Sequence, residues 1–252
     1  MIKVCIIGAA GRLGSILTDA IRETQDLVIS YLIVDEQSKS LGQKNQNLTY
    51  THYIENPDEV DIIIDFSTRE SALLHLQTAI KYNKPYVIGT TGFSDIELNI
   101  IKSAAKEIPI MHSHNFSYGI AVLKKVLEVT CKALDESFDI EILETHHRNK
   151  LDSPSGTAIN LFNTIKHNNP RYYPVTDERY QGEKRKMREV GIMSQRGGNI
   201  CGEHEIRFIS DHEEIYLGHK AFDRKIFALG AIKAARWLIG KPGGLYEFEE
   251  IL

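Results

Sequence analysis

The stretch IKVCIIGAAGRLG, residues 2–14, joins a near-continuous apolar run to three glycines spaced GxxGxxG. The apolar run predicts a strand that is buried on both faces, as strands of parallel sheets are. Gly8 would then allow a tight turn, Gly11 a close approach of the backbone to a pyrophosphate, and Gly14 close packing of a helix on the strand. We expect a dinucleotide-binding loop formed by Gly8, Ala9, Ala10, Gly11, Arg12 and Leu13. The alternative is a tight turn without a ligand.

Short β-rich runs alternate with helical periodicity over the first part of the chain. Strands are expected at 2–7, 27–34, 61–66, 86–88 and 108–111, and helices at 12–23, 71–82 and 94–107. Strand and helix in repeated alternation predict an α/β fold, a Rossmann-type doubly wound parallel sheet.

The pattern changes near residue 118. A long helix is expected at 120–134 and a strand at 138–143, and strands near 189–195, 203–209 and 213–218 then follow without helices between them. Such an order is typical of a second α+β domain that carries a mixed sheet. We therefore expect a dinucleotide-binding domain at 1–117, completed by the segment 228–252, and a second domain at 118–227.

The composition limits the partners of this protein. Its 252 residues are 42% apolar, and its net charge of −4 does not favour binding to nucleic acid. No apolar run approaches the length of a membrane span. The three distant cysteines form no CxxC pair, as expected for reduced thiols in a cytoplasmic protein. We expect a cytoplasmic protein with neither a nucleic-acid nor a membrane partner.

Asp35 is expected to end the second strand, where a carboxylate can bind the ribose hydroxyls of a dinucleotide. Glu36 follows it, and two carboxylates would repel a ribose 2′-phosphate. Lys39 and Arg12 would offset part of this repulsion. The cofactor is therefore expected to be NADH or NADPH, with NADH favoured.

Two small-residue turns follow the next strands at the edge where ligands of doubly wound sheets bind. The first is GTTG, residues 89–92, and the second is HSHNF, residues 112–116. Ordinary turn chemistry is the alternative for both. The expected ligand contacts are Gly89, Thr90, Thr91, Ser113, His114, Asn115 and Phe116.

The stretch ETHHRNKLDSPSGTA, residues 144–158, places basic side chains beside a Gly-containing turn. His146 and His147 would point to opposite faces of a strand and could not easily share a metal, and no HExxH or cysteine cluster supports a metal site. Ser155 is a candidate N-cap for a helix whose first amides could bind a carboxylate. The stretch predicts a site for a small acidic substrate with an acid–base group, and no metal.

The polar segment 167–190 is expected to be a long solvated loop or lid. A nucleic-acid patch is the alternative, but no fold motif supports it. The spacing of Tyr180 and Lys184 matches the YxxxK pair of short-chain dehydrogenases, which requires a helix. Gly182 opposes a helix there, so the match is interpreted as chance.

Five motifs together make the chain resemble the dihydrodipicolinate reductase family. They are GAAGRLG, DFS at 65–67, GTTGF at 89–93, NFSYG at 115–119 and, above all, ETHHRNKLDSPSGTA. The segment RGGNICGEHEIRF at 196–208 and residues 219–244 extend the resemblance to essentially the whole chain.

The resemblance implies reduction of 4-hydroxy-tetrahydrodipicolinate to tetrahydrodipicolinate with NAD(P)H in lysine biosynthesis. His146 would be the acid–base residue and Lys150 the proton donor. The dicarboxylate substrate would be bound by His147, Ser155, Gly156, Thr157 and Thr91. The family implies a homotetramer assembled through the sheet of the second, substrate-binding domain. Family members often carry Arg where Glu36 stands, and Asn149 replaces a His of some relatives.

Proteins with other functions would share some of these motifs. Another Rossmann oxidoreductase, such as an amino-acid or aldehyde dehydrogenase, would share the glycine loop and an α+β substrate domain. A nicotinamide-binding sensor without turnover would share the glycine loop and Asp35, but it would not need both His146 and Lys150. A purely structural protein would need neither site.

Overall fold

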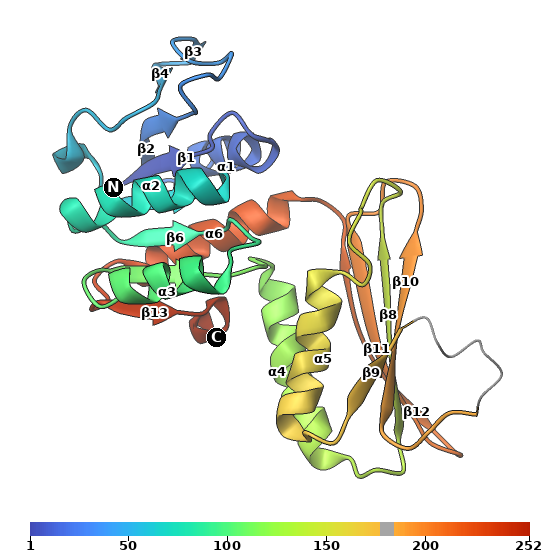
Figure 1. The fold of residues 1–252 in the computed structure, drawn as a ribbon. Coiled ribbons are helices and arrows are strands. Elements are labelled where there is room, and N and C mark those ends of the chain that lie inside the picture. The colour runs from blue at the N-terminus through green and yellow to red at the C-terminus, as the bar shows by residue number, and fades with distance from the viewer. Residues whose placement is uncertain (177–183) are drawn as a thin grey trace. The chain divides into compact units, whose positions relative to one another are not determined.

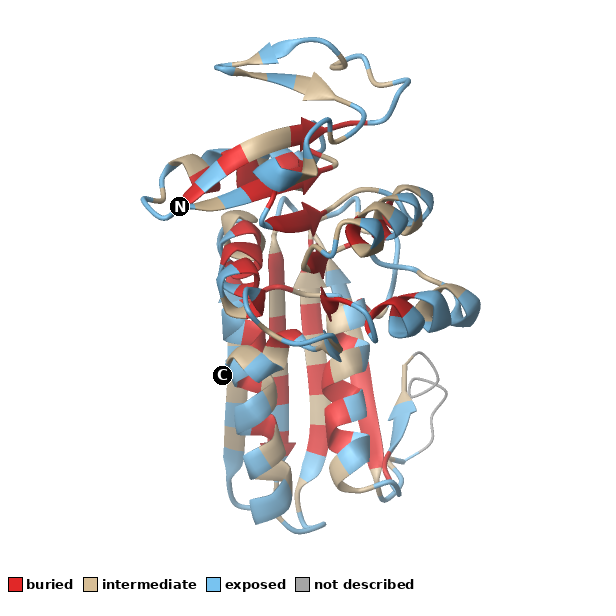
Figure 2. Cartoon of the chain, turned by 90° about the vertical axis from the view of Figure 1, so that its left-hand side faces the viewer, coloured by how far each residue is buried: buried red, intermediate tan, exposed pale blue. Residues whose placement is uncertain are grey.

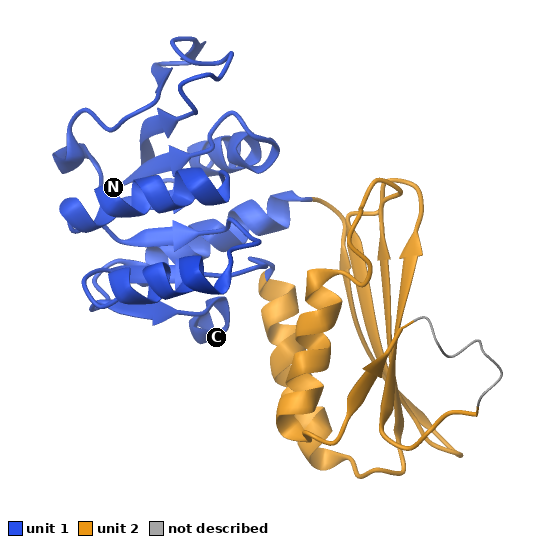
Figure 3. Cartoon of the chain, viewed as in Figure 1, with its two compact units in different colours: residues 1–117, 224–252 blue, residues 118–223 orange. Residues whose placement is uncertain are grey.

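A computed structural model describes residues 1–176 and 184–252, and its chain divides into two compact units (Figure 3). Unit 1 comprises residues 1–117 and 224–252, and unit 2 comprises residues 118–223. Among the described residues, every helix is too short or too polar to span a bilayer.

Unit 1 is an eight-stranded sheet with helices on both sides (Figure 1). The strand order is β13-β7-β6-β5-β1-β2-β4-β3, and every neighbouring pair is parallel except β3 and β4. The elements in chain order are β1 (Ile2–Ile7), α1 (Arg12–Arg22), β2 (Leu27–Ile33), β3 (Lys44–Asn45), β4 (Leu48–Thr51), a 3₁₀ turn (Pro57–Glu59), β5 (Ile62–Asp65), α2 (Arg69–Lys81), β6 (Tyr86–Ile88), α3 (Asp95–Ala104), β7 (Pro109–His112), α6 (Lys225–Leu238), β13 (Gly244–Tyr246) and a second 3₁₀ turn (Phe248–Ile251).

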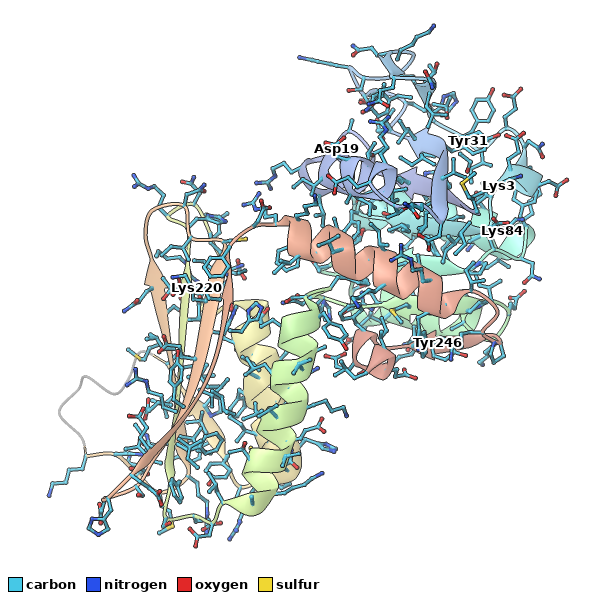
Figure 4. All side chains as sticks on the ribbon, turned by 180° about the vertical axis from the view of Figure 1, so that it is seen from behind. Lys3, Asp19, Tyr31, Lys84, Lys220 and Tyr246 are labelled. Atoms are coloured by element: carbon cyan, nitrogen blue, oxygen red, sulfur yellow. The ribbon has the colours of Figure 1, made fainter. Side chains whose placement is uncertain are left out.

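The core of unit 1 lies where the sequence is most continuously apolar. The strands β1, β5 and β6 are buried on both faces (Figure 2). Two helices begin at hydroxyl N-caps: Thr68 accepts from the amide of Ser71, and Ser94 forms a capping box with Glu97. The C-terminal segment completes this unit, and Tyr246 of β13 (labelled in Figure 4) packs edge-on against Trp237 of α6. The predicted doubly wound parallel sheet is confirmed.

Unit 2 is a five-stranded mixed sheet, ordered β12-β11-β8-β10-β9, with two helices on one face. Strands β8 and β10 are parallel and β11 is antiparallel to β8, so the predicted mixed sheet is confirmed. The helices cover an apolar layer because alternate residues of β8 and β11 are buried (Figure 2). The elements are α4 (Tyr118–Ala133), β8 (Asp139–His146), α5 (Gly156–Asn168), β9 (Tyr173–Val175), β10 (Glu189–Arg196), β11 (Gly202–Ile209) and β12 (Glu214–Ala221).

Several boundaries differ from the expected ones. Strand β8 runs to His146 instead of ending at 143, because its last three residues pair with β10, and Glu144 and Thr145 also pair with β11. The short strands β3, β4, β9 and β13 were not predicted, since two to four residues carry too little periodicity to detect.

The expected solvated loop at 167–190 is only partly correct. Its first residues complete α5, and β9 pairs with β10. The guanidinium of Arg185 forms ion pairs with Asp139, at 2.8 Å, and with Glu141. Tyr180, of the YxxxK match, and Gly182 lie outside the described residues.

Candidate functional site

The glycine loop of unit 1 forms a cradle of backbone between β1 and α1. Gly8 has a φ of +75°, which side-chain-bearing residues rarely adopt. A Cβ on Gly14 would lie 2.1 Å from the carbonyl oxygen of Gly8, so only glycine lets α1 approach this closely. Gly11 caps α1 without a side-chain hydrogen bond, and the first turn carries no acidic residue. The N–H groups and dipole of α1 therefore suit an anionic group such as a pyrophosphate.

A buried carboxylate organises the turn after β5. Asp65 is fully buried and accepts hydrogen bonds from the amide (2.7 Å) and hydroxyl (2.6 Å) of Ser67 and from the hydroxyl of Tyr86 (2.5 Å). The hydroxyl of Thr90 lies 3.4 Å away and ties the GTTG turn to the same group. Burial raises the pKa of Asp65, and the bonds from Ser67 and Tyr86 offset only part of that effect. Asp65 thus links the turns after β5 and β6.

The turn after β7 is held by its own polar groups. The hydroxyl of Ser113 donates to the carbonyl of Asn115 at 2.8 Å, and the Asn115 side chain accepts from the amide of Ser117 at 2.8 Å. Phe116 is buried and His114 is exposed. These turns follow β5, β6 and β7, which are neighbours in the sheet, so the structure brings Gly89, Thr90 and residues 113–116 to one sheet edge.

Three expected contacts of unit 1, Asp35, Thr91 and Arg12, lie on the surface. Asp35 stands two residues beyond the end of β2 rather than ending it; it is exposed and accepts from the amide of Gln37 at 2.8 Å. Glu36 is exposed and lies 3.9 Å from the imidazole of His52. Thr91 is exposed in the GTTG turn. Arg12, expected in the loop, is exposed at the start of α1.

In unit 2, Glu144 is the centre of a buried charged cluster. Its carboxylate is fully buried and accepts both Nη groups of Arg196, at 2.7 and 2.9 Å. It also accepts from Nδ1 of His146 at 2.5 Å and from the amide of Ser155 at 3.1 Å. Burial by itself raises the pKa of Glu144, but the bonds from His146 and Arg196 outweigh burial and hold that pKa well below its usual range. The carboxylate is therefore ionised at neutral pH.

A second imidazole lies beside this cluster. The rings of His146 and His204 meet edge to face with centroids 5.1 Å apart, and Nε2 of His204 lies 3.2 Å from the hydroxyl of Ser155. Burial, with further contributions from the charges of His146 and Lys150, lowers the pKa of His204 to about 3. His204 is therefore neutral at physiological pH.

The remaining expected residues surround this cluster. The amine of Lys150 pairs with Asp152 at 2.9 Å. Ser155 is the N-cap of α5, as predicted, and accepts from the amide of Ala158 at 3.2 Å. Gly156 and Thr157 then form the first turn of the helix, and His147 is half-buried just beyond β8. Unit 2 thus brings His146, Lys150 and the start of α5 into one neighbourhood. In the described part of the chain, no group of three His, Cys, Asp or Glu side chains could hold a metal ion.

Sequence reasoning missed three residues that support these sites, namely the fully buried Asp65 and Glu144 and the partly buried Arg196. The proximity of Glu144 to His146 could have been predicted, because residues two apart on a strand share a face and His146 is two residues further on. No sequence signal joins Glu144 to Arg196, since they meet only through the parallel pairing of β8 and β10.

Comparison with known proteins covers both units. The N-terminal model of dihydrodipicolinate reductase matches residues 2–116, and the C-terminal model matches residues 119–252. The chain is 36% identical to the 4-hydroxy-tetrahydrodipicolinate reductase of Pseudoalteromonas translucida, covering 99% of this chain and 97% of that protein. It is 38% identical to the enzyme of the same name from Clostridium tetani, over 100% and 97% of the two chains.

Solved structures agree on the fold. A dipicolinate-bound dihydrodipicolinate reductase from Paenisporosarcina sp. TG-14 superposes with a TM-score of 0.81 at 22% identity, covering 100% of both chains. An aspartate semialdehyde dehydrogenase from Vibrio cholerae has a TM-score of 0.57 at 12% identity, over 94% of this chain and 98% of the other. Because both family models and the sequence relatives match nearly the whole chain, the chain belongs to the dihydrodipicolinate reductase family.

Proposed function

We propose that this protein reduces 4-hydroxy-tetrahydrodipicolinate to tetrahydrodipicolinate with NADH or NADPH, a step of lysine and diaminopimelate biosynthesis. The observation that carries the proposal is the match of both halves of one reductase family to residues 2–116 and 119–252. A nicotinamide-binding sensor would need only the first of these matches.

Unit 1 is the proposed dinucleotide-binding domain. The backbone cradle at 8–13 and the uncapped start of α1 fit a pyrophosphate. The turns at Gly89–Thr91 and Ser113–Phe116 are the proposed contacts for the rest of the cofactor. Asp35 would bind the ribose hydroxyls, and the exposed Glu36 beside it favours NADH over NADPH because it would repel a 2′-phosphate.

Unit 2 is the proposed substrate domain. The substrate is a small dicarboxylate, and the structure from Paenisporosarcina sp. TG-14 holds dipicolinate, which is such a molecule. One carboxylate would bind at the start of α5, through Gly156 and Thr157, with His147 as a further contact. The amide of Ser155 already donates to Glu144, so Ser155 would act by capping and orienting this turn.

The chemistry assigned to unit 2 is proton transfer. Loss of water from the substrate creates a conjugated C=C–C=N system. The cofactor, when bound, supplies a hydride to this system, and the neighbouring carbon must then receive a proton. Lys150 is the proposed donor, and its amine lies 2.9 Å from the carboxylate of Asp152. His146 is the proposed acid–base partner. The positive charges of this neighbourhood would also offset the two carboxylates of the substrate.

The proposed assembly is a homotetramer formed through the sheet of unit 2. Within this unit, α4 and α5 cover one face of the sheet only. The other face carries half-exposed side chains, among them Tyr216 and Lys220, and the amine of Lys220 (labelled in Figure 4) pairs with Glu203 at 2.6 Å. Light scattering after size exclusion tests the assembly, and a monomeric mass would refute it.

A coupled assay tests the reaction directly. Pyruvate and aspartate semialdehyde, with the synthase that condenses them, generate the unstable substrate in place. Loss of reduced-nicotinamide absorbance is then followed with NADH and with NADPH. Turnover is expected with both and faster with NADH. No turnover from a folded protein that binds NADH would favour a sensor instead.

Substitutions test the assigned roles. Lys150→Ala and His146→Ala are each expected to lower kcat by at least about a hundredfold, as loss of a general acid or base does. Lys166→Ala, on the exposed last turn of α5, is the matched control. Near-normal turnover of both site variants would end this assignment of roles.

A further inference from the structure

The arrangement of hydrogen bonds around Glu144 has a consequence for the hydrogen on the His146 ring. An ionised carboxylate can only accept, so each of its four contacts must come from a donor. The two Nη groups of Arg196 and the amide of Ser155 are donors in any state. The fourth contact is Nδ1 of His146 at 2.5 Å, and Nδ1 must therefore carry a hydrogen.

The opposite nitrogen of the ring is then the one that can exchange a proton. With a hydrogen on Nδ1, neutral His146 presents a lone pair at Nε2. A Cβ built on Gly202 would stand 3.0 Å from Nε2, tighter than ordinary contact, so a glycine at the start of β11 keeps this side of the ring open.

The contacts of Glu144 balance the charge of its carboxylate and also hold the carboxylate in place. Arg196 supplies the compensating charge through a bidentate pair, and its Nη2 also donates to the carbonyl of Asp152 at 2.6 Å. The amide of Ser155 connects the same carboxylate to the cap of α5. One buried group thus joins the ends of β8 and β10 to the helix start that is proposed to bind substrate.

We propose that Glu144 is a positioning residue, whose buried carboxylate holds His146 in the Nδ1–H tautomer and fixes the ring against the start of α5. The proposal deepens the proposed function, because it rests on His146 as the acid–base residue. Glu144 acts through His146 and does not itself exchange a proton with the substrate.

The tautomer can be read directly in the full-length protein. Side-chain nitrogen resonances of ¹⁵N-histidine protein are recorded at alkaline pH, and a His146→Gln spectrum identifies the signals of His146 among the ten histidines. We expect Nδ1 to give the protonated-nitrogen shift and Nε2 the shift of a bare nitrogen. A wild-type His146 with its hydrogen on Nε2 would overturn the proposal without any variant.

Glu144→Gln then tests the cause. The amide can donate through its nitrogen, so Nδ1 of His146 can become the acceptor, and the Nε2–H tautomer is expected to increase. We expect kcat to fall at least about tenfold, with a smaller change in KM, because a lost acid–base group affects the chemical step. Glu144→Asp keeps the charge and is expected to restore the Nδ1–H tautomer and part of kcat.

Glu141→Gln is the matched control, because Glu141 lies on the same strand and pairs with an arginine, Arg185, on the other face. It is expected to change neither the His146 signals nor kcat.

An active wild type whose tautomer does not respond to Glu144→Gln overturns the positioning role. If Glu144→Gln does not fold, the wild-type and Glu144→Asp spectra decide the question. A wild type without turnover refutes the proposed function instead, and the tautomer measurement still stands.

Discussion

Asp65 and Glu144 are both fully buried carboxylates at or near the end of a parallel-paired strand, one in each unit, yet their surroundings are opposite in kind. Asp65 accepts only from neutral donors, the groups of Ser67, Tyr86 and Thr90. Glu144 accepts from a bidentate guanidinium and an imidazole. The pKa of Asp65 is raised, chiefly by burial, whereas the pKa of Glu144 is lowered despite burial.

The difference shows that the same buried group can serve two purposes. The neutral donors of Asp65 come from the turn after β5, from β6 and from the turn after β6, so Asp65 holds these turns in shape. Charged donors keep Glu144 ionised, so it can orient a titratable ring as well as hold elements together. The following substitutions and conditions separate these two purposes.

Replacing Glu144 by Gln is expected to have the largest effect on stability. It leaves the guanidinium of Arg196, whose side chain is only 19% exposed, without its counter-ion, and we expect the free energy of unfolding to fall by about 3–5 kcal/mol. Urea denaturation followed by circular dichroism measures it. Glu141→Gln, on the same strand but half-exposed, is the control and is expected to cost less than about 1 kcal/mol. Equal losses of unfolding free energy in the two variants would show that burial of Glu144 does not strengthen its pair with Arg196.

Arg196→Lys is expected to have an intermediate effect. An ammonium cannot make both hydrogen bonds to Glu144, so we expect a loss of about 1.5–3 kcal/mol. Arg188→Lys is the control, because Arg188 makes a similar two-point contact with Glu136 (3.0 and 3.2 Å) where both side chains are about a third exposed. Denaturation midpoints of the two variants are compared directly, and a larger loss from Arg188→Lys would contradict the assignment.

Acidification should weaken unit 2 through His204. The folded pKa of about 3 lies below the ordinary value of 6.5, so between these values the unfolded chain binds the proton and the folded state does not. Stability is therefore complete above pH 6.5 and falls as the pH drops, by up to about 1.4 kcal/mol per pH unit from this group.

Urea denaturation of wild type and His204→Gln between pH 7.5 and about 5 tests this slope. The variant is expected to lose stability less steeply on acidification. His167→Gln, at the exposed end of α5, is the control and is expected to keep the wild-type slope. An unchanged slope in His204→Gln would show that this histidine is not the group responsible.

Asp65→Asn is expected to have the smallest effect. The remaining oxygen can still accept from Ser67, and the new amide can donate to the hydroxyl of Tyr86, which in turn can donate to the carbonyl of Ala72, 3.1 Å away. Because burial opposes the charge of Asp65, we expect a change of less than about 1 kcal/mol. Thermal unfolding beside Glu144→Gln gives the contrast, and a loss as large as that of Glu144→Gln would show that the charge of Asp65 is needed.

Much of the fold could be predicted because the relevant signals are local. The apolar run Ile2–Ile7 and the glycines after it specify a strand, a turn and a helix within neighbouring residues, and the structure has all three. The Ser155 cap was predictable for the same reason, as it depends on one side chain and the amide three residues on. Strand β8 was predicted too short, because its last residues are polar and owe their conformation to pairing with β10 and β11.

Local patterns of apolar residues and glycines were enough to predict the doubly wound sheet, the change to a mixed sheet near residue 118, and a reactive site within residues 144–158. The side chains that support this site could not be predicted, because they come together only in the folded chain. Arg196 reaches Glu144 across 52 positions of sequence, and Tyr86 reaches Asp65 across 21. The physical reason is that a helix cap or tight turn satisfies nearby backbone groups, whereas a buried charge must find its partner wherever strand pairing places one.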